Sequence, residues 1–325
     1  MTDAPDTIVG GRPPRTPFRV ESLPLIAKLC RIGFHRYRRR WAKRLGKRPG
    51  RLLFDVAYHR LKLDGRGVVA LALPTGPARL NFDARKIHYR NLYDGSTDGH
   101  EPEVAAIIET LLPGDGAFYD IGANWGYFSF YAATIPGYSG AIHAFEPIAE
   151  TCADLADLTR QAGLAGRIRW HQVALSDRDG EGAMSFDPVY TGIARLSAAG
   201  ERRVPLARLD GLGLPPPRLI KMDVENHELA ALRGGEATLK RDKPFIVFEN
   251  WIEKVDREAT LAPLRYLESL GFALYLPQWP AAGRALTLAR FAPEARFGFG
   301  DQINALACHR DRATELARVF SAGGS

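Results

Sequence analysis

The chain has 325 residues, of which 46% are hydrophobic and 25% charged, and its formal net charge is +7. These proportions are those of a globular protein large enough to bury a full core, and they exclude a mainly disordered chain. The three cysteines, Cys30, Cys152 and Cys308, lie far apart, so neither a disulfide framework nor a zinc site is expected. A reducing, cytoplasmic setting fits this cysteine usage best.

The positive charge is concentrated near the start of the chain. Residues Lys28 to Arg51 include eleven Lys or Arg and no acid, so the remainder carries a formal charge of −4. Apolar residues recur there at helical spacing, namely Ile26, Cys30, Phe34, Tyr37, Trp41 and Leu45. Such a helix can lie on the anionic inner face of a membrane, dock on the protein body, or follow nucleic-acid phosphates. We expect residues 1–51 to form a disordered start followed by this basic amphipathic helix.

No segment of the chain predicts a secretory signal or a membrane-spanning helix. Prolines and mixed charges interrupt Met1 to Val20, and glycines and a proline interrupt the uncharged run from Ile121 to Phe145. The protein is therefore expected to be cytoplasmic, with peripheral membrane contact through residues 28–51 as one open interpretation.

Residues 52–100 predict a small β-rich lead-in. The runs LLFDVAY, GVVALAL and ARLNFD have the composition of short strands joined by Gly and Pro turns. The stretch EPEVAAIIETLLPGDG then predicts a helix that stops at Pro113 and Gly114.

From Ala117 onward, strand-like runs alternate with helical intervals. These runs are AFYDIG, AIHAFEP, IRWHQVALSD, RLIKMD and PFIVFE, an order typical of a parallel sheet wound with helices. The Gly-rich interval from Arg178 to Asp210 predicts instead a hairpin inserted near the sheet edge. After Glu249 we expect a helix (REATLAPLRYLESLG), a strand (FALYLP) and a final strand (INALACHR), followed by a short polar tail at residues 313–325.

The stretch FYDIGANWGYFSFYAA places Gly122 and Gly126 just after the first of these strands and before a helix. Ligands of open parallel sheets bind at the carboxyl ends of the strands, and glycine lets the backbone approach them closely. An ordinary turn would explain the glycines alone. Glu146, however, ends the next strand, where a carboxylate can accept hydrogen bonds from both hydroxyls of a ribose. Together these residues indicate an adenosine-containing ligand.

Charge indicates which adenosine ligand this is. The turn lacks the third glycine of a dinucleotide fingerprint, and Asp120 comes just before it. Asp120 would repel a phosphate by about 4 kcal/mol at contact distance in a protein-like medium. The amino and sulfonium groups of S-adenosylmethionine are positive, so we expect that cofactor, with its methionine end near Asp120 and its ribose at Glu146.

Several motifs in this order resemble those of the FkbM-type methyltransferases. They are YDIGANWGYFS, AFEP, ALSD, the LD at Leu209 and Asp210, and IKMDVENHELAALRGG. The resemblance implies a class I, Rossmann-like α/β fold at residues 101–312, with a mostly parallel seven-stranded sheet, an antiparallel last strand and helices on both faces. The β-rich lead-in at residues 52–100 would precede it and could cap the acceptor side.

The resemblance also implies transfer of a methyl group to a hydroxyl, often on a sugar. Its implied cofactor-binding residues are Asp120, Gly122, Asn124 and Gly126 at the methionine part, Glu146 at the ribose and Asp177 near the adenine. This chain has Asn226 where the family usually has Gly after DVE. Because Asn tolerates a left-handed backbone better than most residues, the turn is expected to survive.

Carboxylates follow the fourth and fifth strands of the predicted sheet. Asp223 is the first candidate to remove the proton of an acceptor hydroxyl or to orient it, and Glu225 and Glu249 come second. Glu228 is expected only to complement the helix dipole. His227 is a further candidate base, because its unperturbed pKa lies near 6.5. A Mg²⁺ ion shared by carboxylates and a sugar diol is the less favoured alternative, and no metal ligands are assigned.

Two other functions compete with this interpretation. The basic segment would suit an RNA ribose methyltransferase, and an inactive module could bind cofactor and glycan without transfer. The retained acids Asp223, Glu225 and Glu249 disfavour the inactive module. The sequence thus predicts an S-adenosylmethionine-dependent O-methyltransferase whose partner is a hydroxyl-bearing small molecule, saccharide or glycolipid, with nucleic acid less favoured and the oligomeric state open.

Overall fold

The computed structural model describes residues 5–24, 55–92, 99–187, 190–196, 200, 202–279 and 285–323. The basic helix expected at residues 28–51 lies outside the described residues. Within them, every helix is too short or too polar to span a lipid bilayer.

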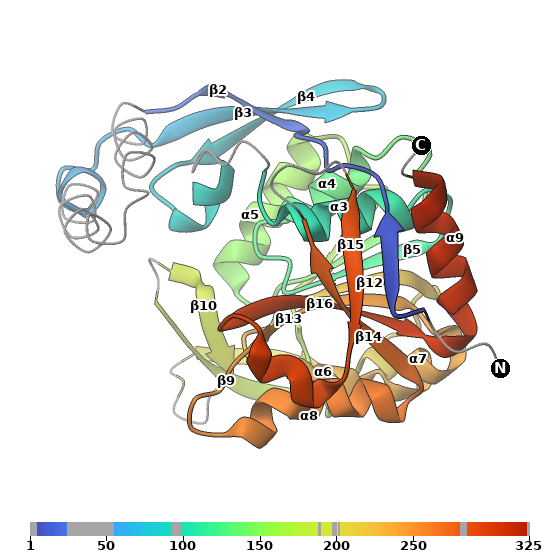
Figure 1. Ribbon diagram of the computed structural model, residues 1–325. Coiled ribbons are helices and arrows are strands. Elements are labelled where there is room, and N and C mark those ends of the chain that lie inside the picture. The colour runs from blue at the N-terminus through green and yellow to red at the C-terminus, as the bar shows by residue number, and fades with distance from the viewer. Residues whose placement is uncertain are drawn as a thin grey trace.

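A nine-stranded sheet forms the centre of the described structure, in the order β1-β15-β14-β16-β13-β12-β5-β6-β7 (Figure 1). Seven of its strands match the runs expected from the sequence: β5 (Ala117–Ile121), β6 (Ile142–Phe145), β7 (Ile168–His171), β12 (Pro217–Met222), β13 (Phe245–Trp251), β14 (Phe272–Gln278) and β16 (Gln302–His309). β16 is antiparallel to both β13 and β14, whereas β12, β13, β5, β6 and β7 pair in parallel. The expected mostly parallel sheet with an antiparallel last strand is therefore confirmed.

Two further strands correct the expected strand number from seven to nine. β15 (Leu286–Phe291) pairs antiparallel with β14, and β1 (Thr7–Gly10) pairs antiparallel with β15. The expectation of a disordered start is wrong for residues 7–10, because Ile8 is buried in the core. The pairing joins residues almost the whole chain apart, such as Thr7 and Ala289, so no local pattern signals it.

The expected polar tail is also wrong. Residues Ala313–Gly323 form helix α9, in which Leu316 and Phe320 are completely buried. The four-residue spacing of these two apolar side chains puts them on one face of the helix, which packs against β1 and α3 (Figure 1).

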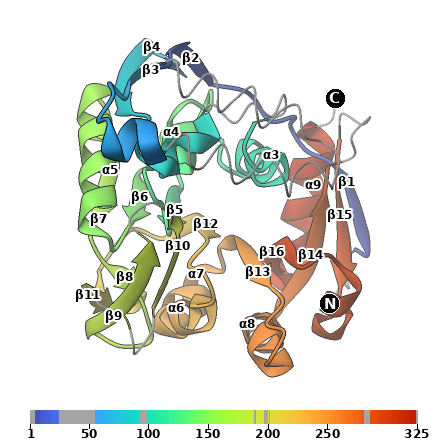
Figure 2. The same ribbon diagram turned by 90° about the vertical axis from the view of Figure 1, so that its left-hand side faces the viewer.

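Helices cover both faces of the central sheet (Figure 2). One face carries α3 (Pro102–Leu111), α4 (Tyr127–Ala133), α5 (Ala149–Gln161) and α9, and the other carries α6 (Glu228–Gly234), α7 (Glu236–Asp242) and α8 (Arg257–Ser269). Side chains alternate along each strand, so Leu219 packs on the first face and Ile220 on the second. Burial on both faces explains why the central strands are almost continuously apolar.

The lead-in forms a separate antiparallel sheet of β2 (Phe18–Ser22), β3 (Arg66–Leu73) and β4 (Gly76–Asp83), seen at the top of Figure 1. The second and third expected strands are confirmed. The first is wrong, since Asp55–Arg60 form a single helical turn, η1, and β2 takes the place beside β3. Another short helix, η2 (Ile87–Leu92), follows β4. The side chain of Gln161 on α5 bonds to Asn81 of β4 and fastens this sheet to the central domain.

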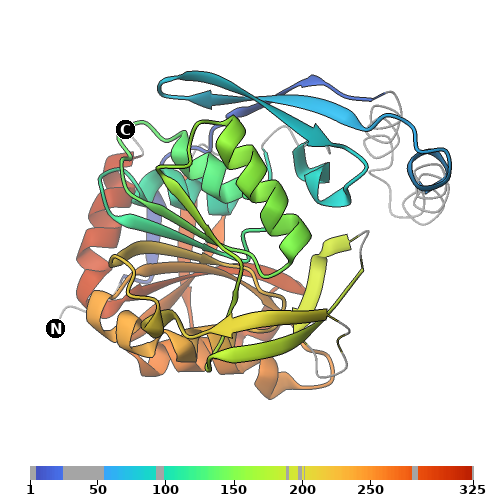
Figure 3. The same cartoon turned by 180° about the vertical axis from the view of Figure 1, so that it is seen from behind.

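The inserted segment forms a second small sheet in the order β10-β9-β11-β8 (Figure 3). Its strands are β8 (Ala174–Leu175), β9 (Gly180–Asp187), β10 (Tyr190–Leu196) and β11 (Arg202–Ala207). The expected hairpin is present as β9 and β10, but it pairs with β11 rather than with the central sheet. The run IRWHQVALSD is two strands, β7 and β8, and its second half belongs to the small sheet. The remaining described elements are three short 3-10 helices, η3 (Leu209–Gly211), η4 (Pro293–Gly298) and η5 (Arg310–Arg312).

Candidate functional site

The turn after β5 brings the ends of two neighbouring strands into close contact. Gly122 has a φ of 77°, and a Cβ added to it would lie 1.8 Å from the carbonyl oxygen of Asp223. Only glycine fits such a position without displacing the backbone. Asn124 is also left-handed, with a φ of 53°, and its Oδ1 accepts a 2.8 Å hydrogen bond from the backbone N–H of Trp125.

A pocket of about 660 Å³, its open mouth included, lies beside this turn. Gly122 and Asn124 form part of its wall. An apolar wall comes from Phe145, Val173, Ala174, Leu175 and Met184, and a polar rim from Glu146, Asp223, Glu225 and His227. A pocket with one apolar wall and a few convergent polar groups is suited to a small ligand with both an apolar and a polar part.

Glu146 is held at this pocket by two backbone donors. Its Oε2 accepts from the N–H of Asn124 at 3.0 Å, and its Oε1 accepts from the N–H of Ile148 at 2.9 Å. Burial raises the pKa of Glu146 to about 7, although the two donors favour the ionised form. The carboxylate is thus fixed in orientation, and its remaining lone pairs can accept hydrogen bonds from a ligand.

Asp120 is completely buried beneath the turn. Its Oδ2 accepts a 2.7 Å hydrogen bond from the hydroxyl of Ser129, while Oδ1 has no hydrogen-bond partner among the described residues. Burial raises the pKa of Asp120, and the neighbouring Lys221 opposes this. An unsatisfied buried carboxyl oxygen is costly, so its presence here needs an explanation such as a bound group or a functional role.

Gly126 and Asp177 are not among the described residues that line this pocket. Gly126 begins α4 with a φ of 94°, and a Cβ there would meet the side chain of Leu155 at 2.4 Å. Close packing of α4 on α5 therefore accounts for this glycine. Asp177 lies next to Ser176, whose hydroxyl is 3.3 Å from its carboxylate.

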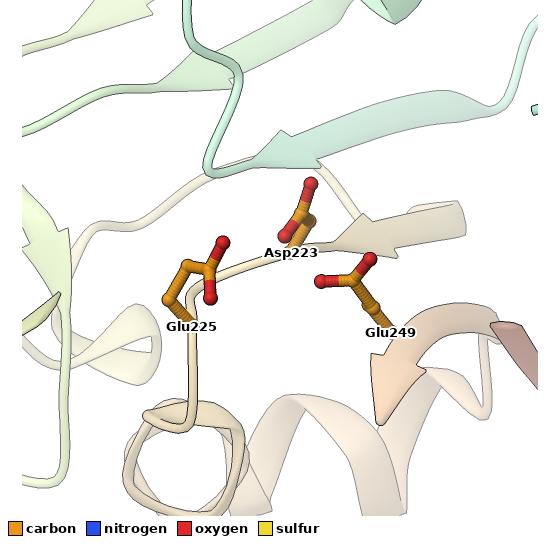
Figure 4. Close-up of side chains that lie close together, drawn as sticks. All are labelled: Asp223, Glu225 and Glu249. Atoms are coloured by element: carbon orange, nitrogen blue, oxygen red, sulfur yellow. The ribbon is translucent and has the colours of Figure 1, made fainter. Parts of the chain in front are cut away.

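Three of the predicted catalytic acids converge at one point (Figure 4). Asp223 directly follows β12, Glu249 lies within β13, and Glu225 lies in the turn before α6. One carboxylate oxygen from each lies within 4.8 Å of the others, an arrangement that could also hold a metal ion. Glu225 and Asn226 are both left-handed, with φ of 51° and 70°, so the prediction that Asn226 keeps the turn is confirmed.

Glu249 has two donors and a strongly perturbed pKa. The indole N–H of Trp251 donates to Oε2 at 2.7 Å, and the side-chain amide of Gln302 donates to Oε1. Burial, together with the negative charge of Asp223, raises the pKa of Glu249 to about 9. Glu249 therefore holds its proton at neutral pH and can act as a hydrogen-bond donor to a ligand.

Lys221 is the residue of the site that the sequence reasoning missed. Its side chain is buried, and its ammonium lies 3.2 Å from Oδ2 of Asp223 and 5.3 Å from the ring centre of Phe128. Burial disfavours the charged form, yet the carboxylates of Asp223 and Asp120 raise the pKa of Lys221 above its ordinary value. The only sequence signal is a lysine inside the apolar run RLIKMD.

His227 and Glu228 occupy the start of α6. The ring of His227 lines the pocket, its Nε2 lies 3.1 Å from the hydroxyl of Ser176, and burial lowers its pKa. Glu228 is buried, and its carboxylate accepts from the N–H of Asn226 at 3.1 Å. Glu228 therefore closes the turn with a specific bond, in addition to the expected dipole interaction, and burial raises its pKa to about 7.

Parts of the chain are similar to known proteins. Residues 120–274 match the family model of the methyltransferase FkbM domain. This region, a little under half of the chain, is thus similar to a methyltransferase FkbM domain. A hexuronic acid methyltransferase, AglP, from Haloferax volcanii is 27% identical over 141 residues, which make up 41% of this chain and 56% of that relative. The chain thus spans little more than half the length of this curated relative.

Solved structures of methyltransferases are also similar to the chain. The methyltransferase FkbM from Methylobacillus flagellatus is 17% identical, with a TM-score of 0.39, over 55% of this chain and 44% of that one. An O-methyltransferase from Bacillus cereus, in complex with SAH, is 13% identical, with a TM-score of 0.37, over 60% of this chain and 84% of that one.

Two motif residues of the FkbM domain have structural roles. The carboxylate of Asp210 accepts hydrogen bonds from the backbone N–H groups of Ala237 and Thr238, which are the first free donors of α7. A Cβ at Gly234 would lie 1.8 Å from the carbonyl oxygen of Ser176, so this glycine lets α6 approach β8. Neither residue lines the pocket beside Gly122, and both fix the positions of helices on that face of the sheet.

Proposed function

We propose that this protein is an S-adenosylmethionine-dependent O-methyltransferase that acts on a hydroxyl of a saccharide, glycolipid or related small molecule. The observation that carries the proposal is the convergence of Asp223, Glu225 and Glu249 at the rim of the pocket that Gly122 and Glu146 form. The name of the Haloferax volcanii relative supports a sugar as the acceptor.

The residues of the pocket fit the proposed cofactor. The apolar wall around Phe145 and Leu175 suits an adenine ring, and the fixed carboxylate of Glu146 suits the two hydroxyls of a ribose. Asp120 does not line the pocket, but its Oδ1 lies beneath the turn, has no hydrogen-bond partner among the described residues and suits the positive methionine end. When bound, S-adenosylmethionine supplies an electrophilic methyl group.

The acids of this chain would handle the acceptor hydroxyl and its proton. Asp223 accepts the hydroxyl proton as the oxygen attacks, and the 3.2 Å contact with Lys221 orients its carboxylate. Glu249, which keeps its own proton at neutral pH, donates a hydrogen bond to a second oxygen of the acceptor. Positioning of the acceptor in line with the transferred methyl group supplies much of the rate enhancement.

The proposal is tested by incubating the purified protein with methyl-labelled S-adenosylmethionine and an extract of its source cells. The extract is then separated into glycan, lipid, nucleic-acid and small-molecule pools. Alkali-stable label in the glycan or glycolipid pool supports the proposal, and the Asp223→Ala variant should bind the cofactor but transfer no label. Label in nuclease-sensitive RNA, or full activity of Asp223→Ala, would contradict it.

A further inference from the structure

A second pocket lies on the other side of Glu249 from the pocket with Gly122. It measures about 980 Å³, its open mouth included, and is formed by the start of α3, the end of β14 and the start of β16. The first pocket lies over β5, β6 and β12. In the strand order of the central sheet, β13, which carries Glu249, lies between the strands of the first pocket and those of the second.

Hydrogen bonds connect this second pocket to the acid cluster. Gln302 lines the pocket and donates its side-chain amide to Glu249. Asn304, also in the wall, is the register partner of Glu249 across the β13–β16 ladder, and its amide donates to Glu103 at 2.9 Å. A molecule in the second pocket would therefore lie next to the groups that handle the acceptor hydroxyl.

The wall of the second pocket suits a sugar ring. Three amide side chains, those of Gln278, Gln302 and Asn304, offer both donors and acceptors, and the carboxylates of Glu101 and Glu103 accept from hydroxyls. Between them lie the apolar side chains of Leu276, Pro277, Phe299 and Ile303. A sugar presents the complementary pattern, with hydroxyls at its edge and C–H groups on its faces.

The charge of this wall restricts which sugar can enter. None of the described residues that line it is Lys, Arg or His. The buried ammonium of Lys221 already contacts Asp223. His100 lies 3.4 Å from Glu101, but burial lowers its pKa to about 4, so it is neutral at pH 7. Burial raises the pKa of Glu101 to about 7, so this side chain is only partly ionised at neutral pH. A carboxylate or phosphate on the sugar would therefore meet the negative charge of Glu103 with no cationic partner among the described residues of the wall, which is costly.

We propose that the second pocket is the acceptor pocket and that it takes a saccharide unit without negative charge, because the carboxylate of Glu103 disfavours uronic acids and sugar phosphates. The acceptor would then differ from the hexuronic acid in the name of the Haloferax volcanii relative. This inference rests on the proposed function and specifies its substrate class.

The first test examines the labelled product. The glycan labelled from the cell extract is hydrolysed by acid, and the labelled O-methyl sugar is applied to an anion exchanger before and after phosphatase treatment. Label that passes through both times as a neutral sugar supports the inference. Retained label would overturn the charge preference while leaving the O-methyltransferase activity intact, whereas the absence of label from every glycan or lipid pool would overturn the proposed function itself.

The second test changes the charge of the wall. Glu103→Gln keeps an oxygen that can accept from Asn304, and Glu268→Gln on the exposed face of α8 makes the same charge change on the opposite side of the sheet. The kcat/KM for the neutral acceptor is compared with that for its uronic acid counterpart. Glu103→Gln should reduce the preference for the neutral sugar by about tenfold, as expected for one charge at close range in a partly solvated site. Glu268→Gln should not change it, and an equal preference in wild type and both variants would contradict the role of Glu103.

Discussion

Replacement of Glu249 by Gln should reduce the loss of stability that the protein suffers as the pH rises. The pKa of Glu249 is raised from an ordinary value of 4.5 to about 9, chiefly because the side chain is buried. Its folded-state pKa therefore exceeds its unfolded value. The stabilisation from the bound proton is complete below about pH 4.5 and is lost as the pH rises through 9. Gln carries no titrating proton, so its variant lacks this dependence.

The magnitude follows from the size of the pKa shift. Between pH 4.5 and about 9, each unit of pH increase lowers the free energy of unfolding of the wild type by about 1.4 kcal/mol relative to that of the variant. Between pH 5.5 and 8.5 this gives at most about 4 kcal/mol, and roughly half of that if Glu101, whose pKa is also raised, shares the titration. In a protein of this size about 2 kcal/mol corresponds to roughly 3 °C in Tm.

The assay is thermal or urea unfolding of wild type and Glu249→Gln at several pH values in one buffer mixture. Only the difference between the two proteins is used, so the titrations of Glu146 and Glu228 cancel. Any constant cost of placing an amide beside Gln302 also cancels, because it does not change with pH. Parallel pH profiles would refute the reasoning, and Glu268→Gln provides the control for a Glu-to-Gln change on the surface.

Further predictions concern the turn, the cofactor and the metal alternative. Gly122→Ala should lower the free energy of unfolding by more than about 2 kcal/mol in urea titrations, because it adds backbone strain to a collision with the carbonyl of Asp223. Glu146→Gln should weaken S-adenosylmethionine binding in calorimetry by about tenfold or more, since the amide replaces one acceptor with a donor. Asp223→Asn should bind the cofactor nearly normally but lower kcat by about a hundredfold or more, and equal losses of affinity in both variants would contradict this division of roles. Methyl transfer should persist in the presence of a chelator, because Lys221 already neutralises Asp223. If the chelator abolished activity and added Mg²⁺ restored it, the acid cluster would be reassigned as a metal site.

The central sheet could be predicted from the sequence because its strands are buried on both faces and are therefore nearly continuous apolar runs. The edge strands β1 and β15 could not, because their pairing depends on partners far away in the chain. Helix α9 has a clear apolar face, with Leu316 and Phe320 four residues apart, but alanine, serine and charged residues around them made the segment look like a polar tail.

The candidate site was predictable where a residue directly follows a strand of the sheet. Gly122, Glu146 and Asp223 are of this kind, because the carboxyl ends of parallel strands always meet at one edge. Glu103 comes from a helix before the first of these strands, and Asn304 from the antiparallel strand near the end of the chain. Only the strand order brings them together, so spacing along the sequence carries no signal of the second pocket.

The two ends of the described chain hold each other in place. The backbone N–H of Gly11 donates to the carbonyl of Phe320 at 2.7 Å, and a Cβ at Gly10 would lie 2.3 Å from the same oxygen. The N–H of Arg12 donates to Thr110 of α3, and Arg15 pairs with Glu109. Removal of α9 would therefore uncover the apolar surface on which it packs and would also loosen β1, the edge strand of the sheet, and an exposed edge invites aggregation. Truncation at either end should thus be tested for its effect on the packing of the other end and on the solubility of the whole protein.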